Sequence, residues 1–384
     1  MMQAPVGKRN LGKQGRLPSG RLATWLDRRA DRLFVLPAVV VILAFSIFPL
    51  LVSAYLALSR FQLVAGGYRL RYVGWLNFKK LLFGSEQFHF LGVFAPVPWY
   101  GWLLLAAGAW FLLRRLVAYL QDGRLTAAGI LGRLIGAALL LAILLLFAAT
   151  LGPGGQFGSL GVTVLYVALG VAAQFVIGLG LALLCAQQIA ARGFFRVVFF
   201  IPLMVTPVGV AYTFRMLADM TQGPLSPIWR VLGLGDLSWA SAAWSARTVV
   251  MVGDSWQWIP FIFLVMLAAL ESQSREQIEA ASLDGAGFWQ IFRDVTWPEI
   301  APVAATVCLI RVIEAFKIID LPNVLTNGGP GIATESLTLH SFIAWRTLDL
   351  GGSAAVAYML LFVSTVAAVS FFNFVIIPQR RARA

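Results

Sequence analysis

Charged residues are scarce in this sequence. Only 12% of its 384 residues are Asp, Glu, Lys or Arg, whereas 59% are hydrophobic and the mean hydropathy is +0.81. A soluble domain has about one quarter charged residues, so this composition excludes an ordinary soluble globular protein. The apolar runs reach the roughly 20 residues that a helix needs to cross a membrane, and they lack the alternation of a membrane barrel. The sequence therefore predicts an all-α, polytopic membrane protein.

Cysteine and histidine are also rare, with two of each. Cys185 and Cys308 lie in apolar runs without a CxxC spacing, so we expect small buried hydrophobic residues rather than a disulfide or metal pair. His89 and His340 form no HExxH motif, and the sequence contains no GxxxxGK[ST] phosphate-binding loop. We therefore expect a chain that is not an enzyme and that binds no metal or cofactor itself.

The apolar runs predict eight membrane spans. Their approximate bounds are 34–58, 97–113, 134–151, 161–186, 195–217, 248–270, 301–320 and 355–377. With eight crossings both termini share one side, and most of the 30 Lys and Arg residues fall on that side. The positive-inside rule assigns it to the cytoplasm. A smaller basic cluster between Arg60 and Lys80 falls on the outer side, against the rule.

The N-terminal arm is basic and precedes the first apolar run. That run is too long for the hydrophobic region of a cleaved signal peptide, so we expect it to be retained as the first span. The arm is expected to lie near anionic lipid, and no nucleic-acid partner is expected. The predicted regions are a basic cytoplasmic tail (1–33), a first span with an outer segment (34–96), a two-span hairpin (97–151), a core (160–378) and a second basic cytoplasmic tail (379–384).

The connection between the sixth and seventh predicted spans, residues 271–300, has an unusual charge. It holds six of the 17 acidic residues of the chain but only two basic ones. Topology alone places the opposite charge on a cytoplasmic connection. The excess of acid therefore favours a specific role for this segment, although an acidic connector without a partner remains the alternative.

Local signals within this connection predict a helix, a turn and a second helix. Ser274 with Gln277, and Thr296 with Glu299, have the spacing of capping boxes that begin helices. Gly285 is suited to the left-handed conformation that ends a helix. A second short helix is expected over 288–293. The segment is thus predicted to be a rigid helical knob that transmits force.

The same segment resembles the EAA signature in the membrane subunits of bacterial ABC importers. The residues EAA at 279–281, a glycine at 285 and VTWP at 295–298 keep the spacing of that signature. The aspartate at 284 matches the version in carbohydrate importers, while the tryptophan at 297 replaces the usual leucine. The resemblance implies that the residues docking on the ATPase subunits are Glu279, Ala280, Ala281, Asp284 and Gly285.

A second stretch, NGGPG at residues 327–331 followed by Thr334 and Glu335, resembles the external loop before the last span of maltose-type sugar permeases. The family resemblance covers residues 160–378 well and residues 30–95 weakly. The resemblance implies a six-span permease core in the cytoplasmic (inner) membrane of a bacterium or archaeon. The hairpin at 97–151 is then an addition of open role.

The resemblance also implies partners and a function. The expected partners are two ATPase subunits that use ATP and magnesium, a second permease subunit that forms a heterodimer with this chain, and an extracytoplasmic substrate-binding protein. The implied function is import of a sugar or related polyol. An anionic substrate such as glycerol phosphate, and a gradient-driven secondary carrier, remain alternatives. An intramembrane glycosyltransferase is disfavoured because Asp219 and Asp236 are isolated from other acids.

Charges on the seventh predicted span indicate a candidate substrate path. Arg311, Glu314, Lys317 and Asp320 recur every three residues, which places them along one side of a helix. An unpaired charge costs about 2.5–3.5 kcal/mol at the centre of a bilayer, so this stripe must face protein or water. It is either a self-paired ladder that fixes helix packing or a polar wall of the path.

The sixth predicted span offers a complementary set, Asp254, Trp256 and Gln257. An aromatic ring stacks on the apolar face of a sugar, while amide and carboxylate groups bond its hydroxyls. Tryptophans of an interfacial belt have the same composition and are the alternative. On the fifth predicted span, Arg215 is expected to extend toward the outer interface.

Overall fold

The computed structural model describes residues 35–121, 126–187, 192–233 and 239–376. The chain divides into two units, residues 1–55 and 56–384. The elements in chain order are η1 (Leu43–Ile47), α2 (Phe48–Ala57), β1 (Ser59–Val64), β2 (Gly67–Tyr72), α3 (Leu76–Phe83), α4 (Gln87–Phe90), β3 (Gly92–Val93), α5 (Trp99–Gln121), α6 (Ala127–Thr150), β4 (Gln156–Phe157), α7 (Ser159–Leu165), η2 (Tyr166–Gly170), α8 (Val171–Ala186), α9 (Arg192–Met204), α10 (Pro207–Ala218), α11 (Ser226–Val231), α12 (Ala243–Glu271), α13 (Arg275–Leu283), α14 (Phe288–Ile291), η3 (Phe292–Thr296), α15 (Trp297–Ala315), α16 (Asp320–Thr326), α17 (Leu337–Arg346), α18 (Leu350–Phe371) and η4 (Phe372–Ile376).

The described part of the first unit is one apolar helix that continues into the second unit and ends at Ala57. The π-helical turn η1 lies within it, and residues 35–52 are all exposed. A helix without acid or base that exposes side chains such as Phe45 and Leu51 is suited to lipid. The predicted first span is therefore helical over almost its whole predicted length.

Seven helices among the described residues are long and apolar enough to cross a membrane. Seven of the eight predicted spans correspond to them, with shifted ends. The predicted fifth span, 195–217, is wrong as a continuous helix, because α9 and α10 meet at an angle of 100°. Thr206 caps α10 by accepting from the amide of Gly209, and Pro207 then occupies the first turn, where it needs no donor.

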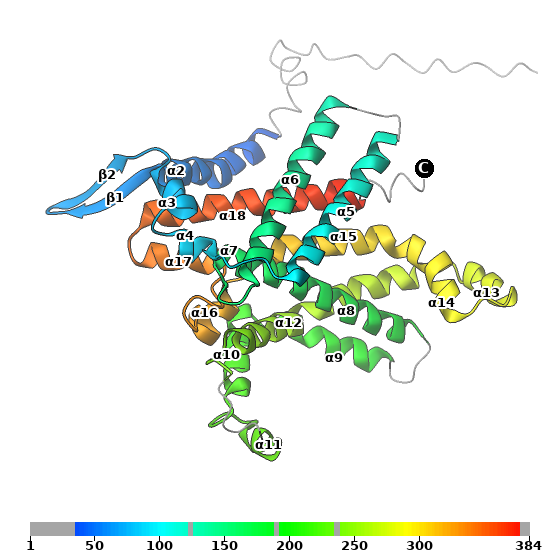
Figure 1. Ribbon diagram of the computed structural model, residues 1–384. Coiled ribbons are helices and arrows are strands. Elements are labelled where there is room, and N and C mark those ends of the chain that lie inside the picture. Colours follow the sequence, from blue (N-terminus) through cyan, green and yellow to red (C-terminus); the bar gives the residue numbers. More distant parts are fainter. Residues whose placement is uncertain (1–34, 122–125, 188–191, 234–238, 377–384) are drawn as a thin grey trace, which may run out of the picture. The chain divides into compact units, whose positions relative to one another are not determined.

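The second unit contains the main helix packing (Figure 1). α12 packs against α8, α9 and α15, and their shared core includes Ile262, Phe263 and Met266. Gly178 permits the contact between α8 and α12, because an added Cβ would lie 2.8 Å from the Cγ2 atom of Ile262. Small residues allow this close approach in membrane helices. α17 and α18 pack together near the opposite end from α13.

The predicted hairpin at 97–151 consists of α5 and α6, which pack on each other, while α6 also contacts α18. Both helices extend beyond the predicted spans. Arg133 consequently lies within α6, where its guanidinium is 3.6 Å from the ring centre of Tyr119 and donates to the carbonyl of Gly129. Two small strand pairs, β1–β2 and β3–β4, add to the predicted all-α architecture.

Candidate functional site

The predicted docking residues lie on α13 and the turn after it. No residue of α13 is buried, and Glu279, Ala280 and Asp284 are exposed. The helix ends in a Schellman motif, in which Gly285 donates to the carbonyl of Ser282 and the next amide, of Ala286, donates to Ala281. Gly285 has φ +81°, the left-handed conformation predicted from the sequence. The motif presents a rigid exposed helix end.

Both predicted capping boxes are wrong. Ser274 is the N-cap residue of α13, but its side chain makes no capping hydrogen bond. Thr296 lies inside a continuous helix, because η3 leads directly into α15. Glu299 instead accepts from the side-chain amide of Gln273 at 2.9 Å. Long-range packing of Gln273 thus replaces the local cap that the spacing suggested.

Large apolar side chains surround the exposed end of α13. Leu283 is 89% exposed and Trp289 74% exposed, and Phe288 is also exposed. A groove of about 490 Å³ lies between α13, the start of α14 and the ends of α8 and α12. Apolar side chains beside a row of acidic residues form a surface suited to a protein partner.

Arg311 is the centre of a buried polar network between three helices. It is 1% exposed, although it lies on a membrane-spanning helix. Its Nε donates to Oε1 of Gln174 on α8 at 2.6 Å, and its Nη2 pairs with Asp254 on α12. Gln174 also donates to Asp254 at 2.7 Å, and the guanidinium lies 4.7 Å from the ring centre of Trp258. The network joins α8, α12 and α15.

The predicted stripe of four charges on one helix is wrong. α15 ends at Ala315, so Lys317 and Asp320 lie beyond it, and Asp320 begins α16. The Nζ of Lys317 pairs with Oε1 of Glu314 at 2.6 Å, and both side chains are exposed to solvent or lipid. Arg311 does not continue this pair, because its own acidic partner comes from another helix. Of the ion pairs expected among these four residues, only Glu314–Lys317 forms.

The remaining predicted path residues on α12 have different surroundings. Gln257 is buried and donates to the carbonyl of Val205 at 3.1 Å, which supports the break between α9 and α10. A freed backbone group in a membrane segment needs such a partner. Trp256 is 39% exposed and packs edgewise on Phe214. Of this set, Trp256 keeps the most surface for a ligand.

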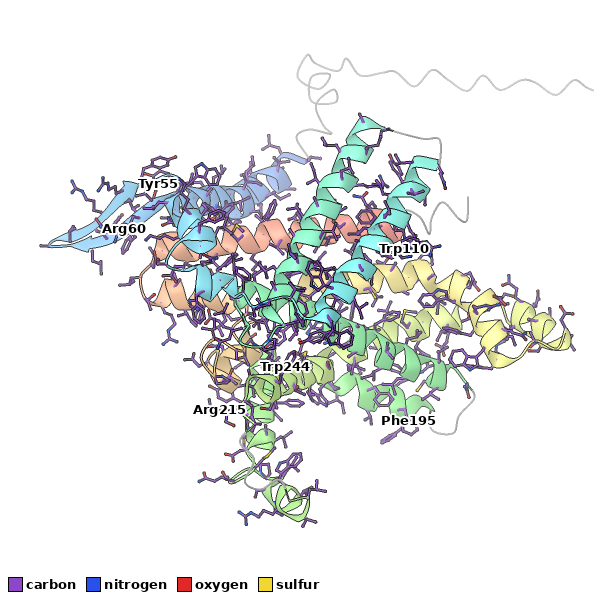
Figure 2. All side chains as sticks on the ribbon, in the orientation of Figure 1. Tyr55, Arg60, Trp110, Phe195, Arg215 and Trp244 are labelled. Carbon is purple, nitrogen blue, oxygen red and sulfur yellow. The ribbon has the colours of Figure 1, made fainter. Side chains whose placement is uncertain are left out.

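Sequence reasoning missed Gln174 and Arg247. A glutamine inside an apolar run was the available signal for the first, because polar residues within a span usually have a partner there. Arg247 is 4% exposed, and its Nε donates to the carbonyl of Ala333 at 2.6 Å. It lines a cleft of about 540 Å³ together with Phe157 and Trp244. Figure 2 shows Trp244 near the start of α12.

The loop before α17 is held by its own hydrogen bonds. Asn327, Gly328 and Gly331 have positive φ, as expected for the glycine-rich turn. Thr334 is fully buried and donates from its hydroxyl to the carbonyl of Gly329 at 2.9 Å. Tyr166 donates to the carbonyl of Thr334 at 3.2 Å. The loop is thus fixed against the helices rather than free.

Arg215 and Asp219 make hydrogen bonds near the end of α10. Arg215, labelled in Figure 2, donates to the carbonyl of Val324 at 3.0 Å. Asp219 accepts from the amides of Gln222 and Thr221 and from the Thr221 hydroxyl. These donors lower the pKa of Asp219, which acts as a turn residue. Asp236 lies outside the described residues.

Comparisons with known proteins agree on one family. The family described as "Binding-protein-dependent transport system inner membrane component" matches residues 174–382, more than half of the chain. The trehalose/maltose transport system permease protein MalF of Thermococcus litoralis is 32% identical over 198 residues, which cover 52% of this chain and 67% of that protein. The sn-glycerol-3-phosphate transport system permease protein UgpA of Agrobacterium fabrum is 28% identical over 242 residues, covering 61% and 80%.

A solved structure has the same fold. The crystal structure of a bacterial ABC transporter involved in the import of the acidic polysaccharide alginate contains a chain with a TM-score of 0.63 and 15% identity. The match covers 94% of this chain and 99% of that chain. Together with the family match, it shows that this chain belongs to the family of binding-protein-dependent transport system inner membrane components, the permease subunits of ABC importers.

Proposed function

We propose that this chain carries a sugar or related polyol across the cytoplasmic membrane and that α13 couples this movement to separate ATPase subunits. The exposure of α13 and its well-defined C-terminal turn support this proposal most. The helix carries the EAA residues, buries none of its side chains and ends in a rigid turn at Gly285. A partner can therefore contact Glu279 and Ala280 without unfolding any part of the chain.

The proposed partners follow from this arrangement. Two ATPase subunits bind α13 and its counterpart on a second permease subunit, and they hydrolyse ATP with magnesium. An extracytoplasmic binding protein delivers the substrate at the opposite end. One matched structure is that of an alginate transporter in complex with an alginate pentasaccharide-bound periplasmic protein. The basic termini support placing both of them, and α13, in the cytoplasm.

Two cations, one on α15 and one just after it, are paired with acids, which favours a neutral carbohydrate over an anion beside α15. Arg311 is paired with Asp254, and Lys317 with Glu314, so neither cation has an uncompensated charge for a phosphate or carboxylate. The names of relatives include trehalose, maltose and starch degradation products, and also sn-glycerol-3-phosphate. The exposed ring of Trp256 is the proposed surface for a sugar, with the Glu314–Lys317 pair as a second polar contact. In this proposal Arg311, Asp254 and Gln257 act through their contacts between helices and do not bind the sugar.

The test is substrate-stimulated ATP hydrolysis by the complete transporter in proteoliposomes. Glu279→Lys reverses the charge at the centre of α13, and Gly285→Pro removes the positive φ of the turn. Both variants are expected to insert normally and to lose stimulated hydrolysis and ATPase association. Gly287→Ala is the matched control, because Gly287 has φ −75° and an added Cβ has space. Full stimulation and normal ATPase association in both test variants overturn the proposal that α13 is the coupling element.

A further inference from the structure

The two histidines of the chain meet in the second unit, although they are far apart in the sequence. The rings of His89 on α4 and His340 on α17 are stacked, with centres 4.0 Å apart. Oε1 of Glu335 lies 2.8 Å from Nε2 of His89 and 3.8 Å from Nδ1 of His340. Ser159 Oγ lies 2.8 Å from His340 Nδ1, and Glu86 Oε2 lies 3.8 Å from His89 Nδ1.

A buried carboxylate faces both rings. Oε1 of Glu335 contacts Nε2 of His89 at 2.8 Å and lies 3.8 Å from Nδ1 of His340. Glu335 is 3% exposed and His340 5%, so bulk water does not solvate either side chain. A buried carboxylate needs hydrogen-bond donors or positive charge nearby, and the imidazole of His89 is its nearest donor. Glu335 thereby orients the His89 ring.

The surroundings of His340 leave one of its ring nitrogens for a metal. The ring is buried and is held between Ser159 and the ring of His89. Since Ser159 contacts Nδ1, the Nε2 atom of His340 remains as the ligand.

We propose that Glu86, His89 and His340 form a binding site for a divalent transition metal, for which zinc is the best-suited probe. One ligand atom from each of the three residues lies within 4.8 Å of the others. Glu335 faces Nε2 of His89 and leaves Nδ1 for the metal, the common carboxylate–histidine–metal arrangement. Two imidazoles and a carboxylate favour zinc, whereas calcium and magnesium prefer oxygen ligands.

To bind a metal, the side chains of Glu86 and His89 must move, whereas His340 stays in place. Zinc–ligand bonds of about 2.0–2.2 Å require closer ligand atoms and a turn of the His89 ring out of the stack. The side chains of His89 and Glu86 are 27% and 49% exposed, so they have room to move, whereas His340 is held by burial and by Ser159. The bound metal would fasten α4, which precedes the α5–α6 hairpin, to α17.

Zinc titration of the purified, chelator-treated transporter complex tests this proposal. The complex is isolated through a tag without histidine, and free Zn²⁺ is followed by competition with a chromophoric chelator. The wild type is expected to bind one more equivalent of Zn²⁺ per chain than His89→Gln/His340→Gln. Ser159→Ala, which removes a group that orients His340, is expected to weaken binding about 10–100-fold. Ser85→Ala, at an exposed neighbouring position, is the matched control.

Equal zinc binding by the wild type and the double variant overturns the proposal. If the double variant does not assemble, Glu86→Gln decides, because Glu86 is exposed and its change preserves the fold. A loss of affinity of about tenfold or more supports the site, and unchanged affinity overturns it. Zinc binding is measured without ATP or sugar, so its failure is distinguishable from failure of the proposed import function.

Discussion

The α13 helix and the network around Arg311 handle polar residues in opposite ways. α13 exposes its acidic side chains and has no buried residue. Arg311, Asp254 and Gln174 are all buried and satisfy one another across three helices. The first region is suited to contact with a partner, while the second fixes the helices of this chain. A charged residue in this chain therefore indicates a functional site only when the residues that it contacts are known.

The largest expected effect comes from breaking the buried pair. Arg311→Met leaves Asp254 buried without its cation, so we expect a loss of about 3–5 kcal/mol in stability. Denaturant unfolding of the detergent-solubilised chain measures it. Arg311→Met/Asp254→Leu removes both charges and is expected to recover much of the loss. A double variant as unstable as the single one would show that the two charges are not coupled.

A smaller loss is expected from closing the space between α8 and α12. Gly178→Ala places a methyl group against Ile262 and the backbone of Phe263, and overpacking of this kind costs about 1–3 kcal/mol. Gly180→Ala is the control on the same helix, because an added Cβ there has no neighbour within 4 Å. Thermal unfolding of the two variants should differ clearly. Equal stability of the two variants would mean that α8 and α12 accommodate the added methyl group without a loss of stability.

At the exposed end, the expected effect is local. Gly285→Ala forces a Cβ into the left-handed conformation at φ +81°, which costs about 1–2 kcal/mol. This corresponds to a factor of about 5–30 in an opening equilibrium. Hydrogen exchange of the amides at Gly285 and Ala286 should accelerate by such a factor, while Gly287→Ala should leave it unchanged. Similar exchange in both variants would contradict a turn that depends on glycine.

The contrast between the two regions also explains what the sequence predicted. The Gly285 turn was predictable because the left-handed conformation is a local property of glycine. The capping role predicted for Thr296 is wrong because η3 continues the helix through that residue. The Asp254 partner of Arg311 lies on another helix, so residue spacing within one helix cannot reveal it.

The same limit applies to the broken span and to the histidine cluster. The apolar run over α9 and α10 is continuous in composition, and the bend depends on Thr206, Pro207 and the distant side chain of Gln257. His89 and His340 carry no spacing signal, since only the fold brings their rings together. The helical class and most spans follow from composition, whereas these sites depend on tertiary contacts.

The smallest effect on stability is expected for Lys317→Met, the same change in side-chain type as Arg311→Met. Its pair with Glu314 is largely exposed, so its loss should change stability by less than about 1 kcal/mol. Sugar uptake in proteoliposomes then separates the two roles left open for this charge. Because stability is nearly unchanged, reduced uptake with normal ATPase association would place Lys317 on the substrate path. Unchanged uptake would limit it to a surface pair and leave Trp256 as the proposed sugar contact.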